Sequence, residues 1–312
     1  MVYRDLTFVS AGSACSSWHF PAQGDHFTTG SGRPAVVMGH GFAGTKDSGL
    51  LPFAEKFQAA GLDVLAFDYR GFGTSEGLPR QHISIDRQVE DYQAAVAAAQ
   101  RLPDVDPSRI VLWGSSLSGG HVLRVAAGRD DIAAVIAMTP MTNSLATGRQ
   151  VVSQYGVGTA LQQTAHGFRS RIATARGRAP VMTPVVARPG QPGCLTLEGA
   201  YESYLSMAGP SWRNEVDASI GIELSRISTA RYAKALRAKL LVQIADFDRY
   251  VPAAAVAKTA VHGRAIVHHY PCDHFDVWPG HELFGQACAD QVNFLRRSLT
   301  SVEDPVRIRS ES

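Results

Sequence analysis

Residues 110–120 read Ile110-Val111-Leu112-Trp113-Gly114-Ser115-Ser116-Leu117-Ser118-Gly119-Gly120. An apolar run passes through a turn of small residues, centred on Ser116, into a segment compatible with a helix. The pattern small-x-Ser-x-small at a strand-to-helix turn is typical of a serine nucleophile that the turn exposes. The free N–H groups and the dipole of the following helix favour negative charge that develops beside the serine.

Apolar runs alternate with helix-like segments on both sides of this turn. The predicted strands are Leu6–Ser10, Ala14–Phe20, Ala35–Met38, Asp63–Asp68, Arg109–Trp113, Ala133–Ala137, Lys239–Ile244 and Ala265–Tyr270. The predicted helices are Leu51–Ala60, Ser84–Leu102, Gly119–Ala127, Pro252–Ala260 and Leu283–Ser298. This alternation predicts an α/β fold, in which helices cover both faces of a mostly parallel sheet.

The alternation stops between about Met141 and Ser225, an interval far longer than an ordinary connecting loop. We expect residues 141–225 to form an inserted, largely helical cap between two core segments, 1–140 and 226–312. Its predicted helices are Leu161–Ala175 and Leu197–Met207.

The predicted cap has an unusual charge distribution. No Asp or Glu occurs between Asp131 and Glu198. Several arginines fall in the same stretch: Arg149, Arg169, Arg171, Arg176, Arg178 and Arg188. The arginines form either a solvated basic face or a surface that attracts an anionic substrate or an acidic partner.

Composition limits the class of protein. The chain has 312 residues and a net charge of +2, which argues against a nucleic-acid binder based on bulk charge. We expect no membrane span, because no apolar run has the required length. The segment Met1–Asp5 lacks the layout of a signal peptide, so a cytoplasmic location is expected. The cysteines show no metal-ligand spacing and are expected to be free thiols: Cys15, Cys194, Cys272 and Cys288.

A serine hydroxyl needs a base to remove its proton and a carboxylate to orient that base. Asp248 follows a predicted strand in the run Asp248-Arg249-Tyr250-Val251-Pro252 and is the favoured acid, with Asp246 as the alternative. His274 follows the last predicted strand and is the favoured base. Weaker candidates for the base lie within or around that strand: His262, His268, His269 and His281.

Acyl transfer also needs hydrogen-bond donors for an oxyanion. The backbone N–H groups of Leu117, which follows the serine, and of Phe42 are the expected donors. Phe42 belongs to the run Gly39-His40-Gly41-Phe42 after the first central strand, where glycines let the backbone turn inward. His40 is expected to support this loop close to the substrate and not to act as the base.

Five motifs in order resemble the α/β-hydrolase superfamily, in particular its esterase, dienelactone-hydrolase and acyl-peptidase-like branches. They are Gly39–Phe42, Asp68–Ser75, Gly114–Gly119, Asp248 with Val251-Pro252, and Asp273–Phe275. The resemblance covers about residues 5–140 and 226–300 but not the predicted cap. It implies an eight-stranded sheet, the triad Ser116, Asp248 and His274, and a structural role for the Asp68–Ser75 turn. Ser118 departs from the commonest motif, which has glycine there, and we expect it to fit.

The expected activity is therefore that of a serine hydrolase acting on a carboxylic ester or lactone, with no metal or organic cofactor. The alternatives are a thioesterase for acyl chains on coenzyme A or a carrier protein, and a non-catalytic binding protein on a hydrolase fold. A small acyl molecule is the expected partner, and a homodimer is left open. Candidate substrate-binding residues, besides His40, are Tyr155, Tyr204, Met207 and Trp212.

Overall fold

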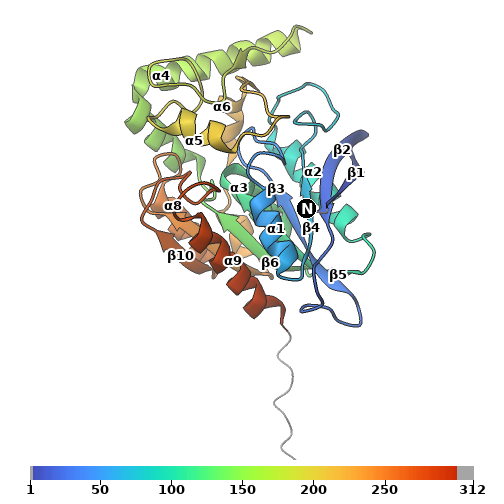
Figure 1. Ribbon diagram of the computed structural model, residues 1–312. Coiled ribbons are helices and arrows are strands. Elements are labelled where there is room, and N and C mark those ends of the chain that lie inside the picture. The colour runs from blue at the N-terminus through green and yellow to red at the C-terminus, as the bar shows by residue number, and fades with distance from the viewer. Residues whose placement is uncertain (1–2, 301–312) are drawn as a thin grey trace, which may run out of the picture.

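The computed structural model describes residues 3–300 and is built on an eight-stranded sheet (Figure 1). The strands are β1 (Arg4–Ser10), β2 (Ser13–Phe20), β3 (Arg33–Gly39), β4 (Asp63–Phe67), β5 (Val105–Ser115), β6 (Ile132–Met138), β9 (Lys239–Ala245) and β10 (Ile266–Tyr270). Their order across the sheet is β1-β2-β4-β3-β5-β6-β9-β10. β2 pairs antiparallel with β1 and with β4, and the remaining neighbours are parallel. The predicted α/β fold with a mostly parallel sheet is confirmed.

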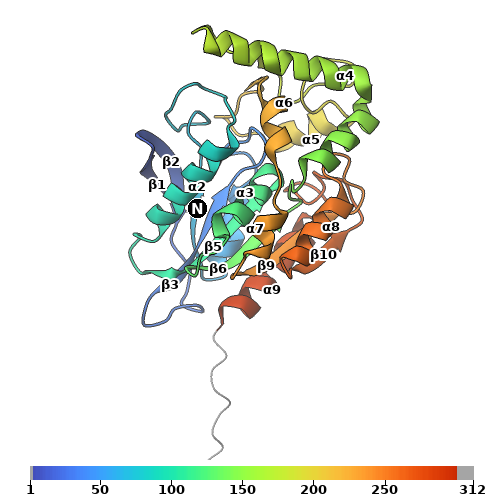
Figure 2. The same cartoon turned by 180° about the vertical axis from the view of Figure 1, so that it is seen from behind.

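Helices cover both faces of the sheet, which explains why the central strands are continuous apolar runs. On one face lie α1 (Leu51–Ala59) and α9 (Phe284–Leu299) (Figure 1). On the other lie α2 (Ile85–Ala99), α3 (Ser116–Ala126), α7 (Ala230–Lys234) and α8 (Ala253–His262) (Figure 2). β4 is buried along its whole length, as is β5 from Ile110 onward. The short helix α7 was not predicted.

The turn after β4 is locked around a buried ion pair. Lys46 Nζ lies 2.7 Å from Asp68 Oδ2, and both side chains are almost inaccessible to solvent. The Asp68 carboxylate also accepts hydrogen bonds from the backbone N–H groups of Lys46 and Thr74. Gly73 leaves the space for this carboxylate, because a Cβ there would lie 2.3 Å from Asp68 Oδ2. The contacts are those of a rigid structural turn.

Residues 141–225, hereafter the 141–225 segment, lie beyond the carboxyl ends of the parallel strands (Figures 1 and 2). The segment holds α4 (Ser144–Ala175), β7 (Met182–Thr183), α5 (Ala200–Met207), β8 (Val216–Asp217) and α6 (Ile220–Glu223), followed by the 3-10 helix η1 (Leu224–Arg226). β7 and β8 form a separate two-stranded sheet. Within residues 3–300, no helix is both long enough and apolar enough to cross a membrane.

The helix predicted at Leu161–Ala175 begins much earlier, at Ser144. Asn143 caps it by accepting a hydrogen bond from the Ala146 N–H. The first half lacks a clear apolar period, which is why the sequence pattern missed it. Gly156 interrupts the helix with φ 81° and ψ 159°, so α4 consists of two arms. The helix predicted at Leu197–Met207 begins only at Ala200, after Gly199 in a left-handed conformation.

Candidate active site

Ser116 stands at the carboxyl end of β5 as the first residue of α3. Its φ of 53° is unusual for a residue with a side chain and marks a strained turn that a fixed surrounding must hold. A Cβ at Gly114 would lie 2.4 Å from the Ser118 carbonyl oxygen, so only glycine fits that side of the turn. The tight turn therefore requires the small residue seen in the sequence.

Ser118 ties the turn to the neighbouring strand. Its Oγ accepts a hydrogen bond from the Ser115 N–H at 3.0 Å and lies 2.7 Å from the Gly39 carbonyl oxygen, to which it donates. Ser115 and Ser118 together form a capping box, so α3 begins at Ser116 and not at Gly119 as predicted. Serine at position 118 thus adds contacts that the glycine of the commonest motif would lack.

Asp248 and His274 form a buried pair. Asp248 Oδ2 lies 2.6 Å from His274 Nδ1, and the two side chains are 3% and 6% exposed. The other carboxylate oxygen of Asp248 accepts hydrogen bonds from the N–H groups of Tyr250 and Val251, at 2.8 and 2.7 Å. The Asp248 carbonyl accepts another from the Gln150 side chain of α4, at 2.7 Å. These contacts fix the carboxylate against the imidazole.

The charge of Asp248 controls the protonation of His274. Burial alone lowers the pKa of the imidazole, because it disfavours the charged form. The Asp248 carboxylate opposes this through its charge and its hydrogen bond, with a further contribution from Asp273. The net result is a His274 pKa above the ordinary value of 6.5. An Nδ1–H donated to Asp248 leaves Nε2 as the nitrogen able to accept a proton.

The alternative candidates for the acid and the base lie away from Ser116. Asp246 Oδ1 lies 2.6 Å from His269 Nδ1 in a pair whose side chains are 38% and 55% exposed. His268 pairs with Asp290, and His281 lies near Asp276. None of these groups, and not His262, lines the cavities beside Ser116 described below.

Two adjoining cavities meet at Ser116. One of about 50 Å³ lies against His274 and is also lined by His40, Tyr204 and Met207. The other, of about 140 Å³, lies between the core and the 141–225 segment and includes Tyr155. The residues that line both are Phe42, Ser116, Leu195 and Tyr250. The structure thus places four of the five predicted substrate-binding residues at these cavities, and Trp212 lines neither.

Tyr204 and Trp212 contact the loop that carries Phe42. The Tyr204 hydroxyl donates to the Phe42 carbonyl at 2.6 Å, and the Trp212 indole N–H donates to the Ala43 carbonyl at 3.1 Å. Ala43 has a φ of 51°, so these contacts hold a strained backbone. Trp212 therefore supports the loop from outside the cavities.

His40 supports the same loop from inside. Its Nε2–H donates to the Ser48 carbonyl at 2.6 Å, and its ring stacks on Trp278. Burial lowers the pKa of His40 to about 4, so the ring stays neutral near pH 7. This environment suits a structural donor better than a base.

Tyr250 was not singled out from the sequence, although it lies in the acid loop two residues after Asp248. Its ring centroid is 5.7 Å from that of His274. Its hydroxyl is buried without a hydrogen-bond partner among the described residues, and burial raises the pKa of this phenol. Its place after Asp248 was the only available signal.

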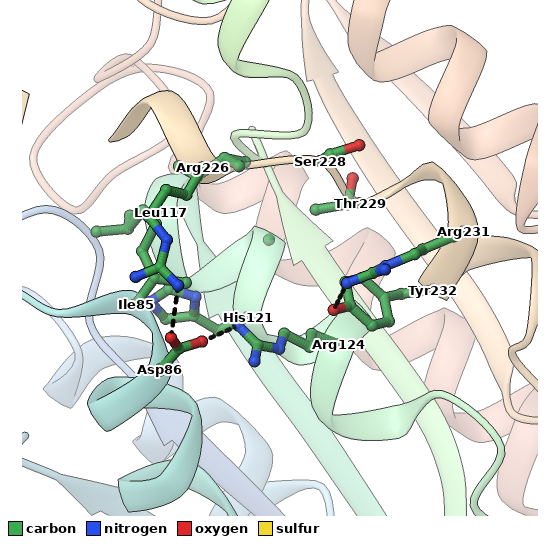
Figure 3. Close-up of a pocket in the computed structure, with 12 residues that line it drawn as sticks. Ile85, Asp86, Leu117, His121, Arg124, Arg226, Ser228, Thr229, Arg231 and Tyr232 are labelled. Carbon is green, nitrogen blue, oxygen red and sulfur yellow. Dashed lines mark hydrogen bonds and ion pairs between the residues drawn. The ribbon is translucent and has the colours of Figure 1, made fainter. Parts of the chain in front are cut away.

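A separate cavity of about 390 Å³ lies between α2, α3 and the segment 226–232. Figure 3 shows its arginines, with Asp86 bridging Arg124 and Arg226 while Arg231 contacts Tyr232. Neither Ser116 nor the Asp248–His274 pair lines it. Within residues 3–300 there is also no cluster of three or more His, Cys, Asp or Glu side chains suited to a metal ion.

Comparisons with known proteins identify the family of the chain. Residues 30–179 match the family model described as "Serine aminopeptidase, S33". The chain is 34% identical over 296 residues to the quorum-quenching protein AidA of Acinetobacter baumannii (strain MDR-ZJ06), covering 94% of each chain. It is 33% identical over 157 residues to thiohydrolase aneE of Aspergillus aculeatus (strain ATCC 16872 / CBS 172.66 / WB 5094), covering 50% of this chain and 49% of the relative.

Among solved structures, the α/β hydrolase GrgF from Penicillium sp. sh18 superimposes with a TM-score of 0.76 at 24% identity, covering 96% of this chain and 99% of the other. A sheet of this order, with a serine at the β5–α3 turn, defines the α/β-hydrolase class. The chain belongs to the α/β-hydrolase superfamily, and its relatives support hydrolase activity.

Proposed function

We propose that the protein is a serine hydrolase that cleaves a carboxylic ester or lactone through an acyl-enzyme intermediate. The observation that carries the proposal is the buried 2.6 Å contact between Asp248 and His274 beside the cavity that exposes Ser116. An oriented imidazole next to a strained serine at a helix start is the arrangement that nucleophilic acyl transfer needs.

The proposed reaction has two halves. His274 Nε2 takes the proton of Ser116 as the serine oxygen attacks the acyl carbonyl, and the backbone N–H groups of Phe42 and Leu117 hold the oxyanion. His274 then gives its proton to the departing alcohol or to the ring-opened oxygen. Water attacks the acyl-enzyme by the same route and regenerates Ser116. Asp248 keeps its negative charge throughout and stabilises the imidazolium that forms twice.

The surroundings favour a substrate of modest size. The 140 Å³ cavity is lined mostly by apolar side chains, among them Met141, Val151 and Leu224. We propose that the 141–225 segment acts as a cap, because its residues form the side of this cavity opposite Ser116 and Leu117. An apolar acyl chain would lie in the cavity with its carbonyl at Ser116.

The test combines Ser116→Ala with labelling. The variant should lose about 10⁴-fold or more of kcat toward p-nitrophenyl esters while its thermal unfolding stays close to that of the wild type. A fluorophosphonate probe should label the wild type at Ser116 and leave the variant unlabelled. Substantial hydrolysis by the variant would overturn the assignment of the nucleophile. Failure of the wild type to react with the probe would instead favour a non-catalytic binding protein.

A thioesterase is the second candidate. The name of the relative aneE, a thiohydrolase, and the exposed arginines of the 141–225 segment favour a thioester on an anionic carrier. Kinetics with matched acyl-CoA and p-nitrophenyl esters, at low and high salt, distinguish the two. A thioesterase should prefer acyl-CoA and lose that preference as salt rises. A preference for simple esters that is insensitive to salt would remove this candidate.

A further inference from the structure

The second arm of α4, after Gly156, carries exposed apolar side chains on one face. Val157, Leu161, Phe168 and Ile172, hereafter the outer stripe, are 60%, 65%, 55% and 49% exposed. Their spacing of four, seven and four residues places them on one side of a helix with 3.6 residues per turn. Large exposed apolar surface of this kind marks an interaction site.

The opposite face of the same arm packs on the protein. Ser170 is fully buried, and its hydroxyl donates to Asp217 Oδ1 at 2.5 Å. Gly167 is also buried, and a Cβ there would lie 3.1 Å from the Ala218 carbonyl oxygen. The outer stripe therefore points away from the body of the molecule. Both views show this arm along the outer edge of the molecule, farthest from the C-terminal helix (Figures 1 and 2).

Cations flank the outer stripe without balancing anions. The helical period puts Arg169 and Arg176 on one flank and Arg171 on the other. All three are exposed, and none has a carboxylate partner within residues 3–300. Because no Asp or Glu occurs between Asp131 and Glu198, α4 itself supplies no carboxylate to this surface.

The outward side of the helix, between the residues of the outer stripe, presents no side-chain hydroxyl that lacks a hydrogen bond among the described residues. Thr164 lies beside the outer stripe on the same side of the helix, and its hydroxyl donates to the Ala160 carbonyl at 2.8 Å, within the helix itself. A protein partner is usually recognised through specific polar contacts, whereas a lipid surface needs apolar side chains with flanking cations.

We propose that the outer stripe and its flanking arginines dock this protein on the surface of a bilayer that contains anionic lipids. The apolar side chains enter the boundary between head groups and acyl chains, and the arginines pair with lipid phosphates and carboxylates. The helix lies in the interface and does not span the bilayer.

The docking surface adjoins the candidate active site. Gln163 and His166, on the inner side of the same arm, line both the 140 Å³ cavity and an outer cavity of about 670 Å³. Docking would therefore bring the outer cavity close to the bilayer, from which an apolar acyl substrate could enter. Membrane binding itself does not depend on the proposed hydrolysis, so the two can fail separately.

The test is flotation of the full chain with phosphatidylcholine vesicles, prepared with and without phosphatidylserine. The wild type should bind the anionic vesicles and lose binding at high salt. Leu161→Glu with Phe168→Glu should weaken binding at least about tenfold, whereas Val261→Glu, at an exposed apolar position of α8, should not. Arg169→Ala with Arg176→Ala should also weaken it about tenfold or more, with Arg296→Ala and Arg297→Ala on α9 as the matched control.

Hydrolysis of a water-soluble ester should stay unchanged in all these variants, which shows that the fold is intact. Equal binding to neutral and anionic vesicles, or no binding at all, would overturn the proposal. So would a wild-type dimer in light scattering that Phe168→Glu converts to monomer, since the stripe would then be a protein interface.

Discussion

The two sides of the candidate site are held by different kinds of contact. On the core side, adjacent parallel strands place Gly39 beside Gly114, so the Phe42 loop and the Ser116 turn leave neighbouring strand ends. On the other side, hydrogen bonds from several separate helices and loops connect the 141–225 segment to the core, among them those of Tyr204, Trp212 and Gln150. A hydrogen-bonded sheet fixes positions collectively, whereas scattered contacts of this kind can be exchanged one at a time. Substitutions on the core side should therefore cause large losses of activity or stability, and substitutions in the 141–225 segment smaller ones.

Asp248→Asn should cause the greatest loss of activity. The amide keeps the shape but removes the charge that holds the His274 imidazole in the right tautomer, and kcat should fall about 10⁴-fold. Asp246→Asn is the matched control, because Asp246 pairs with exposed His269 and should leave kcat within about threefold. Steady-state kinetics on one ester checks both. Equal losses in the two variants would contradict the assignment of the acid.

The next effect is on stability. Lys46→Met leaves the Asp68 carboxylate buried without its cation and should cost about 3 kcal/mol in the free energy of unfolding. Arg171→Met, at an exposed position of the 141–225 segment, should change it by less than about 0.5 kcal/mol. Urea unfolding measures both. A Lys46→Met variant as stable as the wild type would show that the Asp68 turn does not depend on its ion pair.

The contrast between the core side and the 141–225 segment also explains which parts of the site the sequence could predict. Ser116, Asp248 and His274 each follow a predicted strand closed by turn residues, so local pattern was enough to select them for a shared sheet edge. The three side chains come together because the parallel strands that carry them end at the same edge of the sheet. α3 begins at Ser116 and not at the predicted Gly119, because Ser115 and Ser118 form a capping box at the turn.

The 141–225 segment was less predictable, because its structure depends on contacts distant in sequence. Tyr204 lies 162 residues from the Phe42 carbonyl that it contacts, and no local pattern encodes that distance. The outer stripe of the second α4 arm faces outward, although its residues are apolar. An apolar period shows that a helix has a face but not what covers it.

Tyr204→Phe should have an intermediate effect on catalysis. Loss of the hydroxyl leaves the Phe42 carbonyl without this donor and loosens the loop that presents the proposed oxyanion N–H, so kcat should fall about tenfold with little change in KM. Tyr201→Phe on the same helix is the control, because the Tyr201 ring packs against the Arg188 guanidinium and lines neither cavity at Ser116. An increase in KM alone would indicate that Tyr204 binds substrate and does not position the loop.

The smallest predicted change is a shift in the pH dependence of kcat/KM. A general base must be neutral, so kcat/KM should fall as pH drops through the His274 pKa, which lies above the ordinary 6.5. Asp248→Asn removes the charge that raises this pKa and leaves the burial that lowers it, so the pKa should move to lower pH. NMR titration of the His274 ring in the Ser116→Ala background follows this shift without requiring turnover. A titration that Asp248→Asn leaves in place would mean that the 2.6 Å contact does not set the charge of the base, and the core side would then owe its pH dependence to Asp273.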